Sequence, residues 1–167
     1  GYVKTTIDNP KASEISFAKT SDGASWGAVY GQSLQPIAAV KSANAGIRVE
    51  RTIDTAGKSL RVGDKVKVTI TIVADRDYDF VQLCDKRAAC LEPVSQLSGY
   101  RNGYYLAPQD NCTNYFFDRL SKGKHVVETE YFVDRPGSYL SGVCTAECAY
   151  SPEFSGRAEA VQIVVNE

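Results

Sequence analysis

The chain contains a single histidine, His125, and histidine is the usual general base at neutral pH. A serine or cysteine hydrolase would also need a nucleophile beside this ring and a carboxylate behind it. No G-x-S-x-G nucleophile elbow occurs in the sequence. Because His125 follows the Lys122-Gly123 turn, where a strand is expected to start, a structural histidine is the simpler interpretation. The sequence therefore predicts that this chain is not an enzyme.

Three aspartates, Asp75, Asp77 and Asp79, have the spacing of the first half of a calcium loop. Such a loop needs Gly at its sixth position and Glu at its twelfth, where this sequence has Phe80 and Lys86. A solvated turn between two strands explains the aspartates better. The spacings Cys84-x5-Cys90 and Cys144-x3-Cys148 are also wider than those of zinc knuckles. We therefore expect neither a metal site nor a cofactor.

Five cysteines are many for a reduced cytosolic chain of 167 residues, and they favour an exported protein with one or two disulfides. The odd number leaves at least one thiol free or paired outside the chain. The sequence contains no methionine, so we expect it to be a processed piece of a longer protein. Its apolar runs are only a few residues long, which predicts no membrane insertion by this piece.

The formal net charge is −1, with 19 basic and 20 acidic residues spread along the chain. Nucleic acids require a cluster of Lys and Arg, which is missing, so a nucleic-acid partner is not expected. Tyr100, Tyr104 and Tyr105 lie in the least regular region, Glu92–Asn111, which we interpret as a long loop. These tyrosines are a candidate interaction surface. Carbohydrate binding is the alternative, and it would require an exposed, coplanar pair of rings beside a groove.

The elements that must position these residues are strands. In Asp64–Ala74 the β-branched side chains alternate with Lys and Thr, which is typical of a strand with one buried face. Weaker runs of the same kind recur between Gly-containing turns, and no stretch has a helical period. They lie at Tyr2–Ile7, Glu14–Lys19, Trp26–Gly31, Ile47–Ile53, Tyr78–Cys84, Asn114–Asp118, His125–Val133, Ser138–Val143 and Ala158–Val165. The predicted fold is an all-β, antiparallel β-sandwich of immunoglobulin-like architecture.

A composition change near Leu34–Ala45 suggests two parts. Residues 1–45 are expected to form an accessory β segment, and residues 46–167 are expected to form the sandwich.

Six short sequence segments, which lie mainly in the second half, occur in an order that resembles the C-terminal domain of bacterial alpha-2-macroglobulin-like proteins. The likeness is closest to the Bacteroides type. The segments are Val62–Val66, Tyr78–Val81, Asp85–Pro93, Phe117–Gly123, Pro136–Tyr139 and Glu147–Phe154. The usual Met of the last segment is Ala149 here. The resemblance implies a macroglobulin-type sandwich over Ile47–Val165, and it makes residues 1–45 the link from a preceding domain.

In function, the resemblance implies a non-catalytic structural and interaction domain in an exported protein that traps proteases or defends the envelope. Its partners would be neighbouring domains of the parent protein, and a target protease or an envelope protein. The location would be the periplasm or the cell surface, as part of an outer-membrane-anchored lipoprotein. The alternative remains a carbohydrate-binding module of an exported polysaccharide-processing protein.

The resemblance also bears on the cysteines. Thioester-bearing members have Cys-x-x-Gln, and no Gln follows any cysteine here at that spacing, so this piece cannot form a thioester. Cys90 and Cys148 match cysteine positions of the Bacteroides type, which implies a Cys90–Cys148 disulfide. The sequence does not decide which two of Cys84, Cys112 and Cys144 would form a second bridge.

Overall fold

The computed structural model describes residues 2–8, 11, 13–54 and 59–167, and the chain divides into two units, Gly1–Ser33 and Leu34–Glu167. The described residues of the first unit run as extended chain without a helix or a hydrogen-bonded strand. The three strands expected there are therefore not formed. Several of its large apolar side chains are exposed, and Trp26 is 95% exposed.

The second unit is built almost entirely of short strands, as the sequence predicts. The described elements are η1 (Ile37–Ala39), β1 (Ala43–Ala45), β2 (Ile47–Asp54), β3 (Leu60–Arg61), β4 (Lys65–Ala74), β5 (Tyr78–Lys86), β6 (Leu91–Pro93), β7 (Gly99–Arg101), β8 (Tyr104–Pro108), β9 (Cys112–Leu120), β10 (Gly123–Val133), β11 (Gly137–Leu140), β12 (Cys144–Cys148), β13 (Ser151–Ala158) and β14 (Gln162–Asn166).

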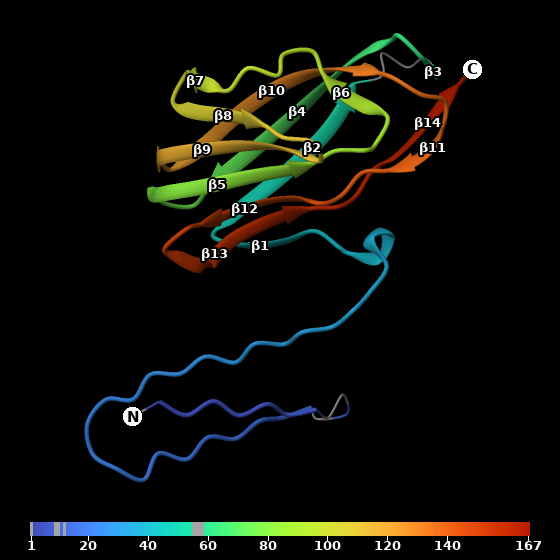
Figure 1. Cartoon of the computed structure of the whole chain (residues 1–167). Helices are drawn as coiled ribbons and strands as arrows, with labels where there is room; N and C mark the ends of the chain where they lie inside the picture. Colours follow the sequence, from blue (N-terminus) through green and yellow to red (C-terminus); the bar gives the residue numbers. More distant parts are fainter. Residues whose placement is uncertain (1, 9–10, 12, 55–58) are drawn as a thin grey trace. The chain divides into compact units, whose positions relative to one another are not determined.

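The strands form three sheets, of which the two larger ones pack as a sandwich (Figure 1). The seven-stranded sheet has the order β1-β13-β12-β5-β9-β8-β7, and the four-stranded sheet has the order β2-β4-β10-β6. All strand pairs in these two sheets are antiparallel. A small third sheet, β11-β14-β3, contains one parallel pair, between β14 and β3. The prediction of an all-β, antiparallel sandwich is confirmed.

Strand β4 shows why the sequence folds this way. Its residues alternate between the core and the solvent, so that Ile70 and Ile72 are fully buried whereas Lys65 and Lys67 are exposed. Burying each such aliphatic side chain stabilises the fold by about 1.5–3 kcal/mol. Strands β4 and β10 supply one layer of the core, and β5 and β9 supply the other.

Two pairs of hydroxyl groups connect the layers inside the core. The hydroxyls of Thr113 and Tyr131 are 2.8 Å apart, and those of Tyr115 and Thr129 are 2.5 Å apart. Both tyrosine side chains are fully buried, and burial raises the pKa of Tyr131 to about 12. Because a buried hydroxyl without a partner is costly, these pairs fix the stacking of β9 on β10.

The region Glu92–Asn111, interpreted from the sequence as a long loop, contains more structure than expected. It includes most of β6 and a hairpin of β7 and β8 around Asn102-Gly103, where Gly103 has φ of +90°. The loop interpretation was wrong because this hairpin adds an edge to the seven-stranded sheet through β8 and β9. The Asn-Gly pair is itself a strong hairpin signal.

The division between the units falls after Ser33, at the start of the Leu34–Ala45 stretch in which the composition changes. Strand β1, which lies within the expected accessory segment, pairs with β13 and so belongs to the sandwich. That residues 1–45 link a preceding domain stays a prediction.

A buried ion pair connects the layers near the end of the sandwich where β5 stops. Arg51 of β2 donates a hydrogen bond of 2.7 Å to Asp85 of β5, and both side chains are at least 98% buried. The same guanidinium donates to the Ser141 hydroxyl and to the carbonyls of Gly142 and Glu159, at 2.7 to 2.8 Å. Ser141 and Gly142 lie between β11 and β12, and Glu159 lies between β13 and β14. Arg51 therefore holds both places where the chain passes between the third sheet and the seven-stranded sheet.

We expect the Arg51→Met substitution to lower the free energy of unfolding by about 3–5 kcal/mol, because it leaves the Asp85 carboxylate buried without a partner. Urea denaturation measures the change. Lys67→Met is the matched control, since the Lys67–Glu128 pair is exposed and its loss should cost less than about 1 kcal/mol. The double variant Arg51→Met/Asp85→Leu should recover much of the loss. Equal effects of the two single variants would contradict a special role for Arg51.

Candidate interaction surface

The three tyrosines singled out in the sequence do not form one surface. Tyr104 and Tyr105 are consecutive residues of β8, so their side chains point to opposite faces of the sheet. Tyr104 packs on the core rings of Tyr115 and Phe117, at centroid distances of 5.6 and 5.5 Å. Tyr100 and Tyr105 meet at 5.2 Å with an interplanar angle of 76°. This arrangement lacks the coplanar rings that carbohydrate binding would require.

A second aromatic pair lies where β5 starts and where the chain turns from β12 into β13. Phe80 and Tyr150 meet edge to face at a centroid distance of 5.4 Å, and they are 52% and 82% exposed. The Phe80 carbonyl accepts a hydrogen bond of 2.9 Å from the Ala149 amide, which fixes this turn against β5. We call Phe80 and Tyr150 the aromatic apex.

The backbone under the aromatic apex is strained. Phe80 has φ of +55° and is the one non-glycine residue with positive φ in the part of the chain that the structure describes. The alternation of β5 breaks here, because Tyr78 and Val81 are both buried whereas Asp79 and Phe80 are both exposed. A left-handed conformation costs a bulky residue about 1–2 kcal/mol. Strain of this kind persists where the surrounding structure enforces it, and it is common at functional sites.

Rigid neighbours support the aromatic apex. The Tyr78 ring packs on Phe154 at 5.4 Å, and the Tyr78 hydroxyl donates a hydrogen bond of 2.5 Å to Asp75. Burial raises the pKa of Tyr78 to about 12. Gly46, with φ of +83°, makes room for Tyr78, since a Cβ atom at residue 46 would lie 2.1 Å from that hydroxyl oxygen. The aromatic apex therefore stands on a well-packed base, and it was missed in the sequence, where the broken alternation around Phe80 was the available signal.

The aspartates that mimic a calcium loop bind protein groups instead. Asp75 accepts hydrogen bonds from Tyr78 and Arg76, and Asp77 accepts from Arg119 at 2.6 Å and from the Lys122 amide at 2.8 Å. No group of three or more His, Cys, Asp or Glu residues suited to a metal ion occurs among the described residues. His125 lies 2.7 Å from the Ser121 carbonyl, a local contact that fits the structural role expected for it.

The fold does not bring Cys90 and Cys148 together, and all five thiols are unbonded in this structure. Cys148 pairs with Val81 in β5, whereas Cys90 follows the end of β5 at Lys86 and precedes β6. At about 3.3 Å per residue, the five residues from Val81 to Lys86 alone span roughly 16 Å. Because a disulfide joins Cα atoms less than about 7 Å apart, the register argues against this bridge. The turn after β12 and strand β6 lie at opposite ends of the sandwich (Figure 1).

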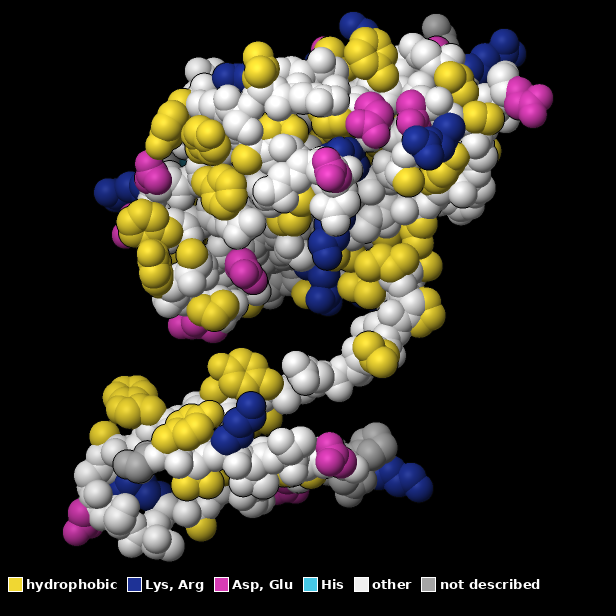
Figure 2. All heavy atoms as spheres, in the orientation of Figure 1, with side chains coloured by type: hydrophobic (Ala, Val, Ile, Leu, Met, Phe, Trp, Pro, Cys, Tyr) yellow, Lys and Arg dark blue, Asp and Glu magenta, His cyan; other side chains and the backbone are white. Residues whose placement is uncertain are grey.

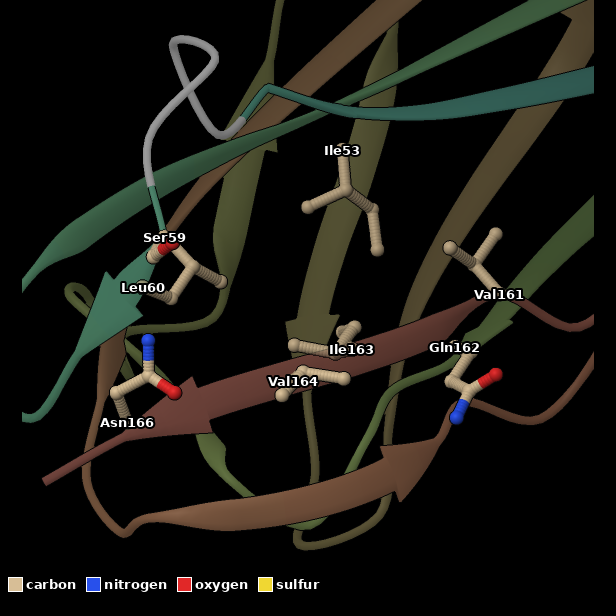
Figure 3. A pocket seen from close by; sticks show the side chains of 8 residues that line it. All are labelled: Ile53, Ser59, Leu60, Val161, Gln162, Ile163, Val164 and Asn166. Carbon is tan, nitrogen blue, oxygen red and sulfur yellow. The ribbon is translucent and has the colours of Figure 1, made fainter.

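One hollow of about 300 Å³ lies beside the third sheet, where β14 and β3 meet the end of β2 (Figure 3). Ile53, Leu60 and Ile163 form its apolar base, and its polar side chains are Ser59, Gln162 and Asn166. None of the described residues that line it has a titratable side chain. Acidic and basic side chains are mixed with apolar ones on the face that Figure 2 shows, without a large patch of either sign.

Within the described ranges, no helix is long and apolar enough to span a membrane.

Comparison with protein-family models shows which family the chain belongs to. The protein-family model described as "Bacterial Alpha-2-macroglobulin MG10 domain" matches residues 42–153, which is most of the sequence. The chain belongs to this family. The match begins just before β1 and ends within β13, so it takes in the aromatic apex, whose residues are part of the MG10 domain.

Solved structures of bacterial alpha-2-macroglobulins share the MG10 fold. Salmonella alpha-2-macroglobulin reacted with methylamine is 23% identical, with a TM-score of 0.68 over 77% of this chain. The native conformation of E. coli alpha-2-macroglobulin is 20% identical, with a TM-score of 0.69 over 80% of this chain. This chain covers 10% of each of those two chains. The E. coli fragment from domain MG7 to the C-terminus is 20% identical, with a TM-score of 0.66, and 79% of this chain and 25% of the fragment are covered.

No curated protein matches the chain. These solved structures are less than 25% identical to this chain, so the likeness establishes the fold. Because the chain spans about a tenth of the full-length relatives, the domain lies among neighbouring domains.

The strain at Phe80 predicts an unusual order of stabilities. Phe80→Ala and Phe80→Gly both remove the ring, but only glycine relieves the positive φ, so we expect the Gly variant to be about 1 kcal/mol more stable than the Ala variant. Phe116, a half-exposed residue of β9 without positive φ, is the matched control. There the Ala variant should be the more stable one by about 0.5–1 kcal/mol. Urea denaturation measures both pairs, and an Ala variant at residue 80 as stable as the Gly variant would disprove the strain.

Asp77 should contribute a pH-dependent part of the stability. Its pKa lies below the ordinary 3.8, first because the Lys122 amide donates to it and second because Arg119 does. A carboxyl with a lowered pKa stabilises the fold above its unfolded-state pKa, and this contribution is lost as the pH falls through the folded-state pKa. We therefore expect the wild-type Tm to exceed that of Asp77→Asn at about pH 6 and the difference to shrink as the pH falls below the ordinary pKa of 3.8 and through the folded-state pKa. Thermal scans across this range measure it, and a pH-independent difference would contradict it.

Proposed function

We propose that this chain is a non-catalytic interaction domain at the C-terminus of an exported bacterial alpha-2-macroglobulin that traps proteases or defends the cell envelope. Its immediate partners are the neighbouring domains of the same parent protein. A target protease or an envelope protein is the partner of the parent as a whole. Family membership supports this role.

The observation that carries the proposal is the aromatic apex. Protein interfaces concentrate their binding energy in a few residues, and Tyr and other aromatic side chains are enriched among them. Phe80 and Tyr150 expose two such rings on a strained but well-supported backbone. Arg76, in the turn that precedes β5, places its guanidinium over the Phe154 ring at 5.2 Å. Exposed aromatic rings on a fixed backbone suit docking on another folded domain.

The first unit supports the same view. Its apolar residues Phe17, Trp26 and Tyr30 are exposed. Exposed apolar side chains in such numbers favour burial against a further surface. We propose that residues 1–45 link the sandwich to the domain that precedes it in the parent.

The proposal extends to the proteases that the parent meets and to its location. Solved structures of E. coli alpha-2-macroglobulin are described as trypsin activated and as activated by porcine elastase, and by analogy the parent of this chain would meet proteases of this kind. The likeness to the Bacteroides type supports a parent in the periplasm or at the cell surface, as an outer-membrane-anchored lipoprotein. The geometry of the tyrosines gives no support to the carbohydrate-binding alternative.

The test compares the isolated chain with the full-length parent. If the aromatic apex docks on a neighbouring domain, backbone amides of residues 78–81 and 149–151 should exchange hydrogen at least tenfold more slowly in the parent. Tyr150→Ser should remove much of that protection, and it should reduce the amount of trypsin that co-elutes with the parent during gel filtration. Hydrogen exchange with mass spectrometry and the co-elution assay supply the two readouts.

Tyr100→Ser is the matched control, because Tyr100 is 74% exposed and lies in the edge strand β7. It should change neither readout. Equal exchange of residues 78–81 and 149–151 in chain and parent would contradict docking through the aromatic apex. A parent that retains no protease, whatever its variant, would contradict the trapping role and leave the docking result standing.

A further inference from the structure

Two cysteines face each other on the outer face of the seven-stranded sheet. Within β5, Leu83 and Asp85 point into the core, so Cys84 between them points outward. The register pairs Cys84 with Asn114 and Lys86 with Cys112. Cys84 and Cys112 are therefore diagonal neighbours on the same face of two adjacent antiparallel strands.

The other cysteines are placed differently. Cys144 pairs with Asp85, and Cys148 pairs with Val81, so both thiols lie on the inner face of the sheet, opposite to Cys84. Cys90 is fully buried just before β6, where its carbonyl accepts a hydrogen bond from the backbone amide of Asp134. Among the five cysteines, Cys112 is thus the one that shares a strand pair and a face with Cys84.

The surroundings of the two thiols leave room for a bond between them. Cys84 is half-buried, and Cys112 is 7% exposed. The Cys112 thiol makes two long polar contacts, donating to the Gln109 side chain at 3.8 Å and accepting from the Asn114 side chain at 3.6 Å. Burial raises the pKa of Cys84 to about 11, and the neighbouring Cys112 thiol adds to the shift. A thiol with so high a pKa is rarely ionised at neutral pH, which does not suit a catalytic nucleophile.

We propose that Cys84 and Cys112 form a reversible disulfide that links β5 to β9. The oxidant is a disulfide of a small thiol or of an oxidoreductase. One cysteine thiolate attacks that disulfide and expels one thiol, and the second cysteine then attacks the mixed disulfide and expels the other. Each protein thiol loses a proton, and the two electrons reduce the incoming disulfide to two thiols.

The diagonal placement predicts the character of this bridge. Diagonal neighbours have Cα atoms about 7–8 Å apart, slightly more than most disulfides span. Closing the bond therefore requires a small shift of the two strands, and a bridge under such strain is more easily reduced than a relaxed one. We expect it to open at lower concentrations of reductant than a typical structural disulfide.

Peptide mapping of the folded chain tests the proposal, because trypsin places Cys84, Cys90 and Cys112 on separate peptides. These are residues 77–86, 88–101 and 102–119, whereas Cys144 and Cys148 share residues 125–157. After incubation with oxidised glutathione at about pH 9, which raises the thiolate fraction, we expect a linked peptide joining 77–86 to 102–119. The number of free thiols should fall by two, and the Tm should rise by several degrees until dithiothreitol restores both.

Cys84→Ser should abolish this linked peptide, and the half-buried position of Cys84 makes the substitution mild for folding. Cys90→Ala is the matched control and should leave the peptide intact, and circular dichroism verifies that each variant is folded. Five free thiols in the folded chain after oxidation would overturn the proposal. So would a linked peptide that joins 88–101 to 125–157, which is the product expected from a Cys90–Cys148 bridge.

Discussion

The sandwich depends above all on one buried charge pair, that of Arg51 with Asp85. A guanidinium withdrawn from water must have nearly all of its hydrogen bonds satisfied by protein, and Arg51 finds its partners in three separate segments of the chain. Burial raises the pKa of Asp85, and Arg51 opposes part of that effect. The pair can form only if β2 and β5 pack at the right position across the two sheets. Both connections between the third sheet and the seven-stranded sheet must also be in place. Arg51 therefore specifies the topology as well as adding to stability.

The two ends of the sandwich differ in character, and β5 connects them. At the end where β5 stops, Arg51 and the core hydroxyl pairs satisfy buried polar groups. At the end where β5 starts, the alternation breaks at Phe80 and aromatic rings project outward. A rigid end can hold an exposed and strained end in a fixed position, and a domain that docks on its neighbours needs this property. The candidate disulfide lies on the same strand and would reinforce the rigid end.

Sequence patterns predict the parts of this fold whose signal is local. Strand β4 can be predicted from the alternation of aliphatic and polar residues alone, because every second side chain is aliphatic and buried. Strands β12 and β13 were largely missed, since Cys144–Cys148 is small or polar and β13 contains Pro152 and Gly156. These residues have low strand propensity, and tertiary packing overrides it. The aromatic apex and the Cys84–Cys112 pair depend on which strands become neighbours, and this information is absent from any single stretch of sequence.

The edges of the seven-stranded sheet limit how this domain meets other chains. The sheet ends on one side in β1 and on the other in β7, and each of these strands has only three residues. Long open edges expose rows of unpaired amides and carbonyls, which recruit strands from other molecules and lead to aggregation. Edges this short offer few such groups. The seven-stranded sheet should therefore resist edge-to-edge pairing with other molecules, and recognition through this sheet should come from side chains rather than from added strands.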